Sequence, residues 1–242
     1  MEASMNELVA SSLRLADELR ELKFSPPVSH VYHTLDYTKE AHHLYLVRYG
    51  SGKKRVIFLG MNPGPYGMAQ TGVPFGEVAA VRDWMGIEML IGKPLEEHPK
   101  RPIEGFDCKR SEVSGRRLWG LFAGKFGTAE VFFKDHFVLN YCPLVWMSAT
   151  GANLTPDKLS TSEMVPVENA CMKHLQEVIS LLKPDYLIGI GGFAEERLRR
   201  AVGQLNIHPK VGKILHPSPA SPAANRGWAA AAQRQMEVQE IW

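Results

Sequence analysis

A strand that leads directly into a stiff loop constrains the fold of this chain more than any other feature. The apolar run at residues 55–59 predicts a buried strand. Residues 60–68 follow at once, with two prolines that fix φ and three glycines that permit positive φ and close approach of another molecule. Open α/β sheets bind ligands at the carboxyl ends of their strands. We therefore expect this loop to hold a small ligand, with the amide of Asn62 as its central polar group.

Further short apolar runs alternate with stretches of helical periodicity. We expect strands at residues 137–141, 186–190 and 211–215, and helices at 6–23, 37–49, 81–86, 114–126, 163–182, 193–202 and from about 225 onward. Ser114 is the expected N-cap of its helix, and Pro166 is expected to interrupt another. This alternation predicts an α/β fold with a short parallel sheet. The 242 residues suffice for one large domain that spans residues 1–242.

Polar side chains lie at the ends of three of the expected strands. Asn62 follows the first strand, Asn140 belongs to the second, and His216 follows the fourth. Because the carboxyl ends of parallel strands share one edge of a sheet, these side chains are expected to converge in one pocket. Asn140 lies within a very apolar run, so it is either a satisfied polar group of the core or a group that contacts a ligand.

Basic side chains dominate the stretch between Arg197 and Met236, which contains no Asp or Glu. The net charge of the whole chain is only +2, so this distribution says more than the total. A segment of one sign favours a surface that faces phosphates or another anion. A solvated basic face without a partner explains the segment equally well.

Three widely separated cysteines, Cys108, Cys142 and Cys171, predict reduced thiols and neither a disulfide framework nor a zinc site. The charged N-terminal region does not resemble a secretory signal, and no apolar run approaches the length of a membrane span. We therefore expect a soluble intracellular protein with no membrane partner, cytoplasmic or, in a eukaryote, nuclear.

Several common catalytic and binding motifs are excluded. Residues 189–194 fit the pattern G-x-G-x-x-A of dinucleotide-binding folds, but no acidic residue follows about 20 positions later to bind a ribose. A tight turn from strand to helix explains these glycines better. The sequence contains no Walker-type phosphate loop and no G-x-S-x-G elbow, and the pair His42 and His43 is too isolated to predict a metal site.

The loop sequence at residues 60–77 and the segment His216-Pro217-Ser218-Pro219 closely resemble the single-strand-selective monofunctional uracil-DNA glycosylases. Similar segments continue in register from about Val31 to the end of the chain, at residues 97–102, 111–115, 153–156 and 225–228. The resemblance implies a three-layer α/β/α fold in which helices cover both faces of a short central parallel four-stranded sheet. It also implies a monomeric base-excision-repair enzyme that acts on uracil-containing single- and double-stranded DNA without a metal or organic cofactor.

The same resemblance assigns roles to individual residues. Asn62 matches the amide that positions the attacking water, and His216 matches the histidine that hydrogen-bonds the base carbonyl O2. Phe75 matches the ring that stacks on the flipped base, and Asn140 the amide that reads the uracil edge. The other residues expected to line the pocket are Met61, Gly64 and Tyr66, and those expected to contact DNA are Asn153, Thr155, Lys158, Pro217, Ser218, Pro219, Ala220, Ser221, Asn225 and Arg226.

The expected substrates are uracil and oxidised relatives such as 5-hydroxymethyluracil, and two alternatives stay open. One is a superfamily glycosylase for another deaminated base, such as xanthine, and the other is a non-catalytic module that binds nucleic acid or nucleotide. Ala220 departs from the vertebrate relatives, which have a basic side chain at this position of the wedge loop, so weaker insertion of the wedge into a duplex is expected. Lys213 is expected on the opposite face of its strand from His216, so water is the expected nucleophile.

Overall fold

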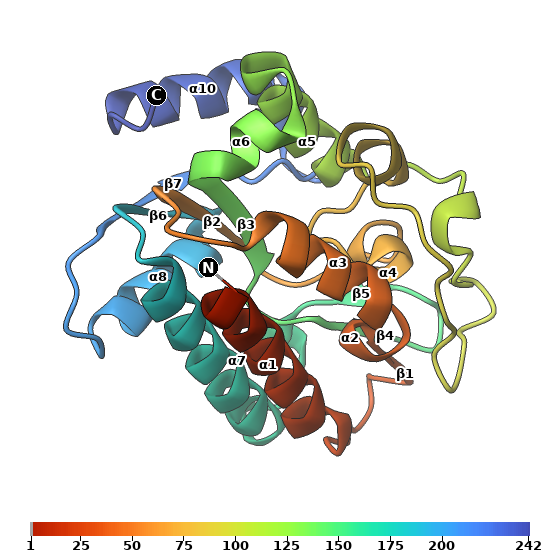
Figure 1. Cartoon of the computed structure of the whole chain (residues 1–242). Coiled ribbons are helices and arrows are strands. Elements are labelled where there is room, and N and C mark those ends of the chain that lie inside the picture. Colours follow the sequence, from red (N-terminus) through yellow and green to blue (C-terminus); the bar gives the residue numbers. More distant parts are fainter. Residues whose placement is uncertain (1) are drawn as a thin grey trace.

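A four-stranded parallel sheet forms the centre of the computed structural model, which describes residues 2–242 and the side chains of residues 7–242 (Figure 1). Its strands are β2 (Val56–Gly60), β3 (His136–Asn140), β6 (Tyr186–Ile190) and β7 (Lys210–Ile214), in the spatial order β3-β2-β6-β7. All neighbouring pairs are parallel. The four expected strands are therefore confirmed, each within one residue of its predicted bounds.

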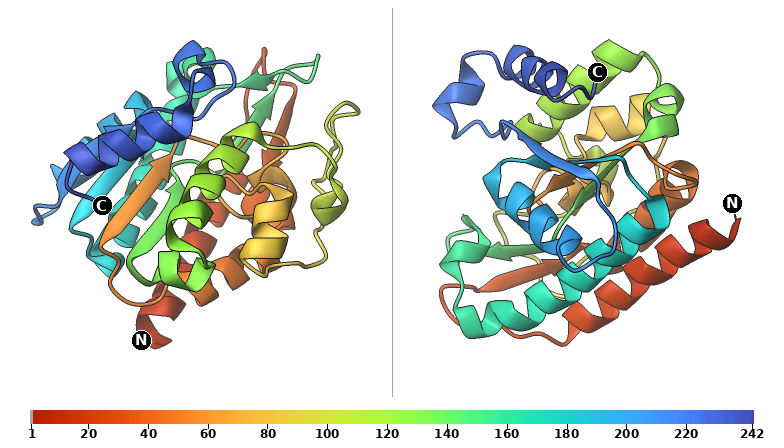
Figure 2. Two further views of the ribbon diagram at one scale, coloured as in Figure 1. Left: turned by 90° about the horizontal axis from the view of Figure 1, so that it is seen from above. Right: turned by 90° about the vertical axis from the view of Figure 1, so that its left-hand side faces the viewer.

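Helices cover both faces of this sheet, as the two views in Figure 2 show. One face carries α1 (Glu2–Arg20), α7 (Thr161–Leu182) and α8 (Gly192–Val202), and the other carries α5 (Val113–Phe126), α6 (Ala129–Asp135) and α10 (Trp228–Val238). Helix α3 (Lys39–Tyr49) packs on β3, where Tyr45 donates a hydrogen bond to the carbonyl of Val138 at 2.8 Å. The three-layer α/β/α arrangement is confirmed.

A sheet with both faces covered requires strands that are apolar on both sides. Strand β2 meets this requirement, because Val56, Ile57, Phe58 and Leu59 are all fully buried. Phe58 packs against Phe122 of α5, with ring centroids 5.0 Å apart. The burial of β2 fixes the position of the loop that follows it.

A second, antiparallel sheet was not predicted. It contains β1 (His30–His33), β4 (Leu144–Met147) and β5 (Asn153–Leu154), in the order β1-β4-β5. No strand was expected at Asn153 and Leu154, but these two residues pair with β4. These strands are short, and the pairing of β1 with β4 joins segments more than 100 residues apart, which local periodicity does not reveal. This sheet brings Asn153 to the rim of the main pocket.

Two helix predictions at named residues are wrong. Ser114 is not an N-cap, because α5 begins at Val113 and its N-cap position, Glu112, makes no capping hydrogen bond through its side chain. Pro166 does not interrupt α7, which is continuous and capped by the hydroxyl of Ser160. Pro166 leaves unpaired only the carbonyl four residues earlier, at Ser162. Ser162 is exposed, so water can satisfy that carbonyl.

Other helix boundaries are corrected in detail. The predicted helix at 37–49 is divided at Thr38 into α2 (Thr34–Tyr37) and α3, and the last helix is divided near Gly227 into α9 (Pro222–Asn225) and α10. The predicted helix at 81–86 is a π-helical turn, Ala80–Trp84, and α4 (Met68–Thr71) occupies part of the expected loop. Short 3₁₀ turns occur at Gly105–Asp107 and Pro156–Lys158.

The three cysteines are free and buried. Among the described helices, none combines the length and apolarity needed to cross a membrane.

Candidate active site

A pocket of about 480 Å³ opens at the carboxyl edge of the parallel sheet. Residues from the loop after β2, from the end of β3, from the segment after β7 and from the start of α5 form its walls. The predicted residues that line it are Met61, Asn62, Gly64, Tyr66, Phe75, Asn140, Asn153, Thr155, His216, Ser218 and Pro219. The predicted residues outside its lining are Lys158, Pro217, Ala220, Ser221, Asn225 and Arg226.

Asn62 belongs to the loop that follows β2 and lines the pocket. Its amino group donates long hydrogen bonds to the carbonyls of Leu144, at 3.4 Å, and Pro63, at 3.5 Å. Within the described part of the chain its side-chain oxygen has no hydrogen-bond partner, so this oxygen is available to accept a bond from a water. The carbonyl of Leu144 belongs to β4, which ties the amide to the second sheet.

Asn140 and Phe75 meet over Gly60, which is opposite Asn140 in the register of β2 and β3. A Cβ at Gly60 would lie 2.3 Å from the side-chain oxygen of Asn140 and 2.5 Å from Cε2 of Phe75. Only glycine permits this approach. Phe75 itself has φ of 54°, in the left-handed region that is unusual for a bulky residue. Trp119 holds it there, donating a hydrogen bond from Nε1 to the carbonyl of Phe75 at 3.0 Å.

The imidazole of His216 is neutral, and its proton is on Nε2. Burial lowers the pKa of His216 below its ordinary value. The backbone N–H of Ser218 donates to Nδ1 at 3.1 Å, so Nδ1 is an acceptor and the single ring proton resides on Nε2. The ring of Phe75 lies 6.3 Å from that of His216. The pocket thus contains a neutral N–H donor beside an aromatic ring.

The glycines at 189 and 191 permit close packing around the turn that follows β6. A Cβ at Gly189 would lie 2.3 Å from the backbone nitrogen of Glu195 at the start of α8, and one at Gly191 would lie 3.3 Å from Cβ of His216. Gly191 also has φ of 95°. The interpretation as a tight turn from strand to helix is therefore correct.

Sequence reasoning missed two charged residues at this site. Glu112 lines the pocket, and its pKa is raised by burial and by the nearby carboxylate of Glu77, against the lowering effect of the backbone N–H groups of Ser114 and Tyr66. Arg117 of α5 donates to the carbonyl of Pro217 at 2.9 Å. It also bonds the carbonyl of Ser218 and the side chain of Asn225. Both residues lie at or near the start of a helix, where charged side chains are common, and no local pattern distinguishes them.

The segment after His216 is an exposed loop braced from within. Asn225 donates to the carbonyl of Pro219 at 2.8 Å, and Ser221 caps α9 by accepting from the backbone of Ala224. Pro217 is buried beneath the loop, whereas Ala220 and Arg226 are exposed. The loop therefore stands beside the pocket with Ala220 free to contact a ligand.

The acid-free segment is not a free basic surface. Within the described residues, five of its basic side chains form ion pairs with carboxylates: Arg197 and Arg200 with Glu168, Arg199 and Lys213 with Glu195, and Lys210 with Glu240. Acidic partners come from outside the segment, so a count along the sequence could not see them. The interpretation as an anion-facing surface is wrong for these five residues. Lys213 is paired at 2.9 Å and does not line the pocket.

Positive charge instead flanks Tyr66 at the rim of the pocket. Arg101 and Arg110 both donate to the hydroxyl of Tyr66, Arg110 at 2.7 Å. Both guanidinium groups also lie over its ring, at 5.3 and 5.2 Å from the centroid. The exposed Arg110 therefore presents a cation beside the pocket opening.

Comparison with known proteins connects this pocket with a family. The model of the "Uracil DNA glycosylase superfamily" matches residues 47–242. The chain belongs to this superfamily. It is 48% identical over 224 residues to the single-strand selective monofunctional uracil DNA glycosylase of Bos taurus, covering 93% of this chain and 82% of that protein. The identity to the protein of the same name from Rattus norvegicus is also 48%, over 225 residues, covering 93% of this chain and 81% of that protein.

The overall structure is similar to the crystal structure of wild-type SMUG2 from Pedobacter heparinus. The TM-score is 0.65 at 17% identity, and the match covers 95% of this chain and 97% of that one. At this identity the likeness supports the superfamily fold alone. The identities near 48% place the chain with the single-strand selective monofunctional uracil-DNA glycosylases.

Proposed function

We propose that this protein is a monofunctional uracil-DNA glycosylase, which removes uracil from DNA by hydrolysis of the N-glycosidic bond. The observation that carries the proposal is the convergence of Asn62, Phe75, Asn140 and His216 in one pocket at the edge of the sheet. The names of the relatives that share almost half of its residues support the same activity. The pocket volume, about 480 Å³, suits a single base with its sugar.

In this mechanism the base first leaves the stack, at a cost of a few kcal/mol that contacts in the pocket must offset. The ring of Phe75 provides a stacking surface. The carboxamide of Asn140 accepts from N3–H and donates to O4, which matches uracil at both atoms. Cytosine presents the opposite pattern at these two positions.

His216 acts on the charge that develops as the bond breaks. The departing base gains negative charge on O2, and the Nε2–H of His216 donates a hydrogen bond there. One such donor is worth roughly 3–4 kcal/mol in the transition state. The sugar becomes an electrophilic cation, so the water needs positioning more than deprotonation, and the free oxygen of Asn62 supplies that. Lys213, an amine close to His216 in sequence, is paired with Glu195 and does not line the pocket, so water is the proposed nucleophile.

DNA approaches across the rim of the pocket. Ser218, Pro219, Asn153 and Thr155 all line the pocket, and we assign them contacts with the bound strand. The exposed Arg110 provides charge for a phosphate. We include in the proposal oxidised uracils as further substrates, both single- and double-stranded DNA, a monomeric state and an intracellular location.

Release of base from oligonucleotides that carry one lesion tests this function. Uracil, 5-hydroxymethyluracil and xanthine are compared in single and double strands, with Asn140→Asp and His216→Ala as variants. We expect uracil release by the wild-type protein and a decrease of roughly 10²–10³ in the single-turnover rate of His216→Ala. Asn140→Asp should lose most uracil release. If the wild-type protein binds these strands and releases no base, it is a binding module; preferential release of xanthine would replace uracil as the substrate.

A further inference from the structure

Selection of uracil by Asn140 depends on which way its carboxamide points. The two ends of a carboxamide have nearly the same shape, and a rotation of 180° about the last side-chain bond exchanges its acceptor and its donors. The rotated amide donates to N3 of cytosine and accepts from the N4 amino group. Rejection of cytosine therefore requires that the protein holds one orientation, provided that Asn140 reads the base as proposed above.

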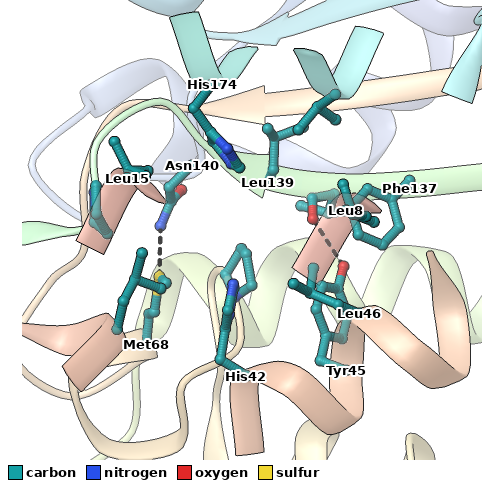
Figure 3. A pocket seen from close by; sticks show the side chains of 15 residues that line it. Leu8, Leu15, His42, Tyr45, Leu46, Met68, Phe137, Leu139, Asn140 and His174 are labelled. Atoms are coloured by element: carbon teal, nitrogen blue, oxygen red, sulfur yellow. Dashed lines mark hydrogen bonds between the residues drawn. The ribbon is translucent and has the colours of Figure 1, made fainter. Parts of the chain in front are cut away.

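A second, smaller pocket lies behind this amide. Its volume is about 30 Å³, and α1, α3, α7 and β3 enclose it. Asn140 and Met68 line both this pocket and the main one, so the amide is a wall between them. His42 and His174 line this pocket together with Asn140, and Figure 3 shows Met68 next to the amide nitrogen. A space of this size accommodates one water molecule if it offers polar partners.

His42 presents a hydrogen-bond acceptor. Its Nδ1 lies 2.8 Å from the carbonyl oxygen of Gly72, which can only accept, so Nδ1 bears a proton. Burial lowers the pKa of His42 to about 4, so the ring is neutral at pH 7. A neutral imidazole has one ring proton. The Nε2 atom of His42 is therefore a lone-pair acceptor.

His174 presents an acceptor for a similar reason. Ser11 donates its hydroxyl proton to the carboxylate of Glu177, which is itself paired with Arg14 at 2.7 Å. The oxygen of Ser11 then accepts from Nδ1 of His174 at 2.8 Å, which places the proton on that nitrogen. Burial lowers the pKa of His174 to about 4, so this ring is neutral as well. Its Nε2 atom is likewise an acceptor.

We propose that His42 and His174 are positioning residues that hold the carboxamide of Asn140, through one water molecule, in the orientation that reads uracil. A water between two acceptor nitrogens donates both of its hydrogens to them. It can then only accept, and the donor available at this wall is the amino group of Asn140. The thioether of Met68, 3.5 Å from Nδ2, is a further acceptor on the same side. A rotated amide would turn its oxygen toward acceptors alone, and buried acceptors without donors are costly.

The tautomer of His174 can be changed without touching the main pocket. In Ser11→Ala the partner that fixes the Nδ1 proton is lost, so the ring can place its proton on Nε2. Ser11→Thr keeps the hydroxyl and is the matched control, and His42→Phe removes the other acceptor. For each folded variant, kcat/KM is measured on matched single strands that carry uracil or cytosine.

We expect uracil release by Ser11→Ala to stay within about threefold of the wild type, and cytosine release to rise at least tenfold. The ratio of kcat/KM for uracil to kcat/KM for cytosine should stay at the wild-type value in Ser11→Thr. It should be lowered in His42→Phe, as in Ser11→Ala. A merely structural role would lower both activities together and leave the ratio unchanged, and that result would overturn the inference. The proposed function would stand in that case, because the wild-type protein would still release uracil. Absence of uracil release from the wild type would overturn both.

Nitrogen-15 NMR of the imidazole rings supplies a measurement on the unaltered protein. The proposal requires a proton on Nδ1 and a bare Nε2 in both His42 and His174 at pH 7. Long-range proton–nitrogen correlations distinguish the two tautomers directly. A proton on Nε2 of either ring would refute the proposed network even if every variant failed to fold.

Discussion

Replacement of Gly60 by alanine tests whether the pocket depends on the close approach of its own side chains. The new Cβ would lie 2.3 Å from the oxygen of Asn140 and 2.5 Å from Cε2 of Phe75. Each of these groups must move by about 1 Å to reach an ordinary van der Waals distance from the new Cβ. Because protein interiors are close-packed, such a movement also displaces neighbouring side chains. Both groups are proposed to contact the base, and a displacement of about 1 Å near a reacting centre can lower a rate by 10²-fold.

Single-turnover release of uracil from a single strand is the appropriate assay. We expect the rate constant of Gly60→Ala to fall by about 10²-fold, with a loss of stability of roughly 1–3 kcal/mol from overpacking. Gly120→Ala on α5 is the matched control, because nothing lies within 4 Å of a Cβ at that position. It should keep the wild-type rate and gain up to about 1 kcal/mol of stability from helix propensity. A wild-type rate in folded Gly60→Ala would show that base recognition does not need the observed positions of Asn140 and Phe75.

Three further predictions concern the loop and the buried histidines. Arg117→Ala should slow uracil release roughly tenfold, because hydrogen bonds from a charged group are worth about 1.5–3 kcal/mol. Arg117→Lys should restore part of the rate. An unchanged rate of Arg117→Ala in single-turnover assays would mean that Arg117 does not brace the loop. Ala220→Arg should tighten binding to an abasic duplex with little change on single strands, which electrophoretic titration of both products checks. Burial lowers the pKa of His42 and His136 to about 4, so protons bind the unfolded chain first as the pH falls. As the pH falls from about 6.5 to 4, each of the two histidines should therefore lower the free energy of unfolding by about 1.4 kcal/mol per pH unit. Above this range their contribution to stability should be complete. Denaturant titrations from pH 7.5 to 4.5 measure the slope, and a flat profile would contradict the buried neutral state of both rings.

The three strands β2, β3 and β6 of the parallel sheet were predictable because each is a nearly continuous apolar run, unlike the edge strand β7, which is mostly exposed or half-buried. Such runs result from burial on both faces, and they are visible within five residues of sequence. The antiparallel sheet was not predictable in the same way. His30–His33 is only partly buried, and Asn153–Leu154 has two residues, so neither is long enough to show a period. The pairing of His30–His33 with Leu144–Met147 also depends on contacts between segments far apart in the chain.

The convergence of Asn62, Asn140 and His216 followed from topology alone, because the carboxyl ends of parallel strands share an edge. The electrostatics of the region did not follow. Glu168 and Glu195 lie before or at the edge of the acid-free segment, and only the fold brings them against Arg200 and Lys213. A run of one sign along the sequence therefore gives no information about charge in space until its neighbours are known.

The glycines of the loop at 60–68 show how a correct pattern can have a different immediate cause from the expected one. They were expected to let another molecule approach. In the structure the approaching groups belong to the protein: Asn140 and Phe75 crowd Gly60, and the carboxylate of Glu112 lies 2.8 Å from where a Cβ of Gly64 would be. A side chain at Gly67 would likewise meet Cγ of Glu112 at 2.9 Å. Side chains that are already in contact need no further ordering when a ligand binds. The glycines therefore act mainly by allowing the protein's own side chains to preorganise the pocket, and only secondarily by leaving space for the base.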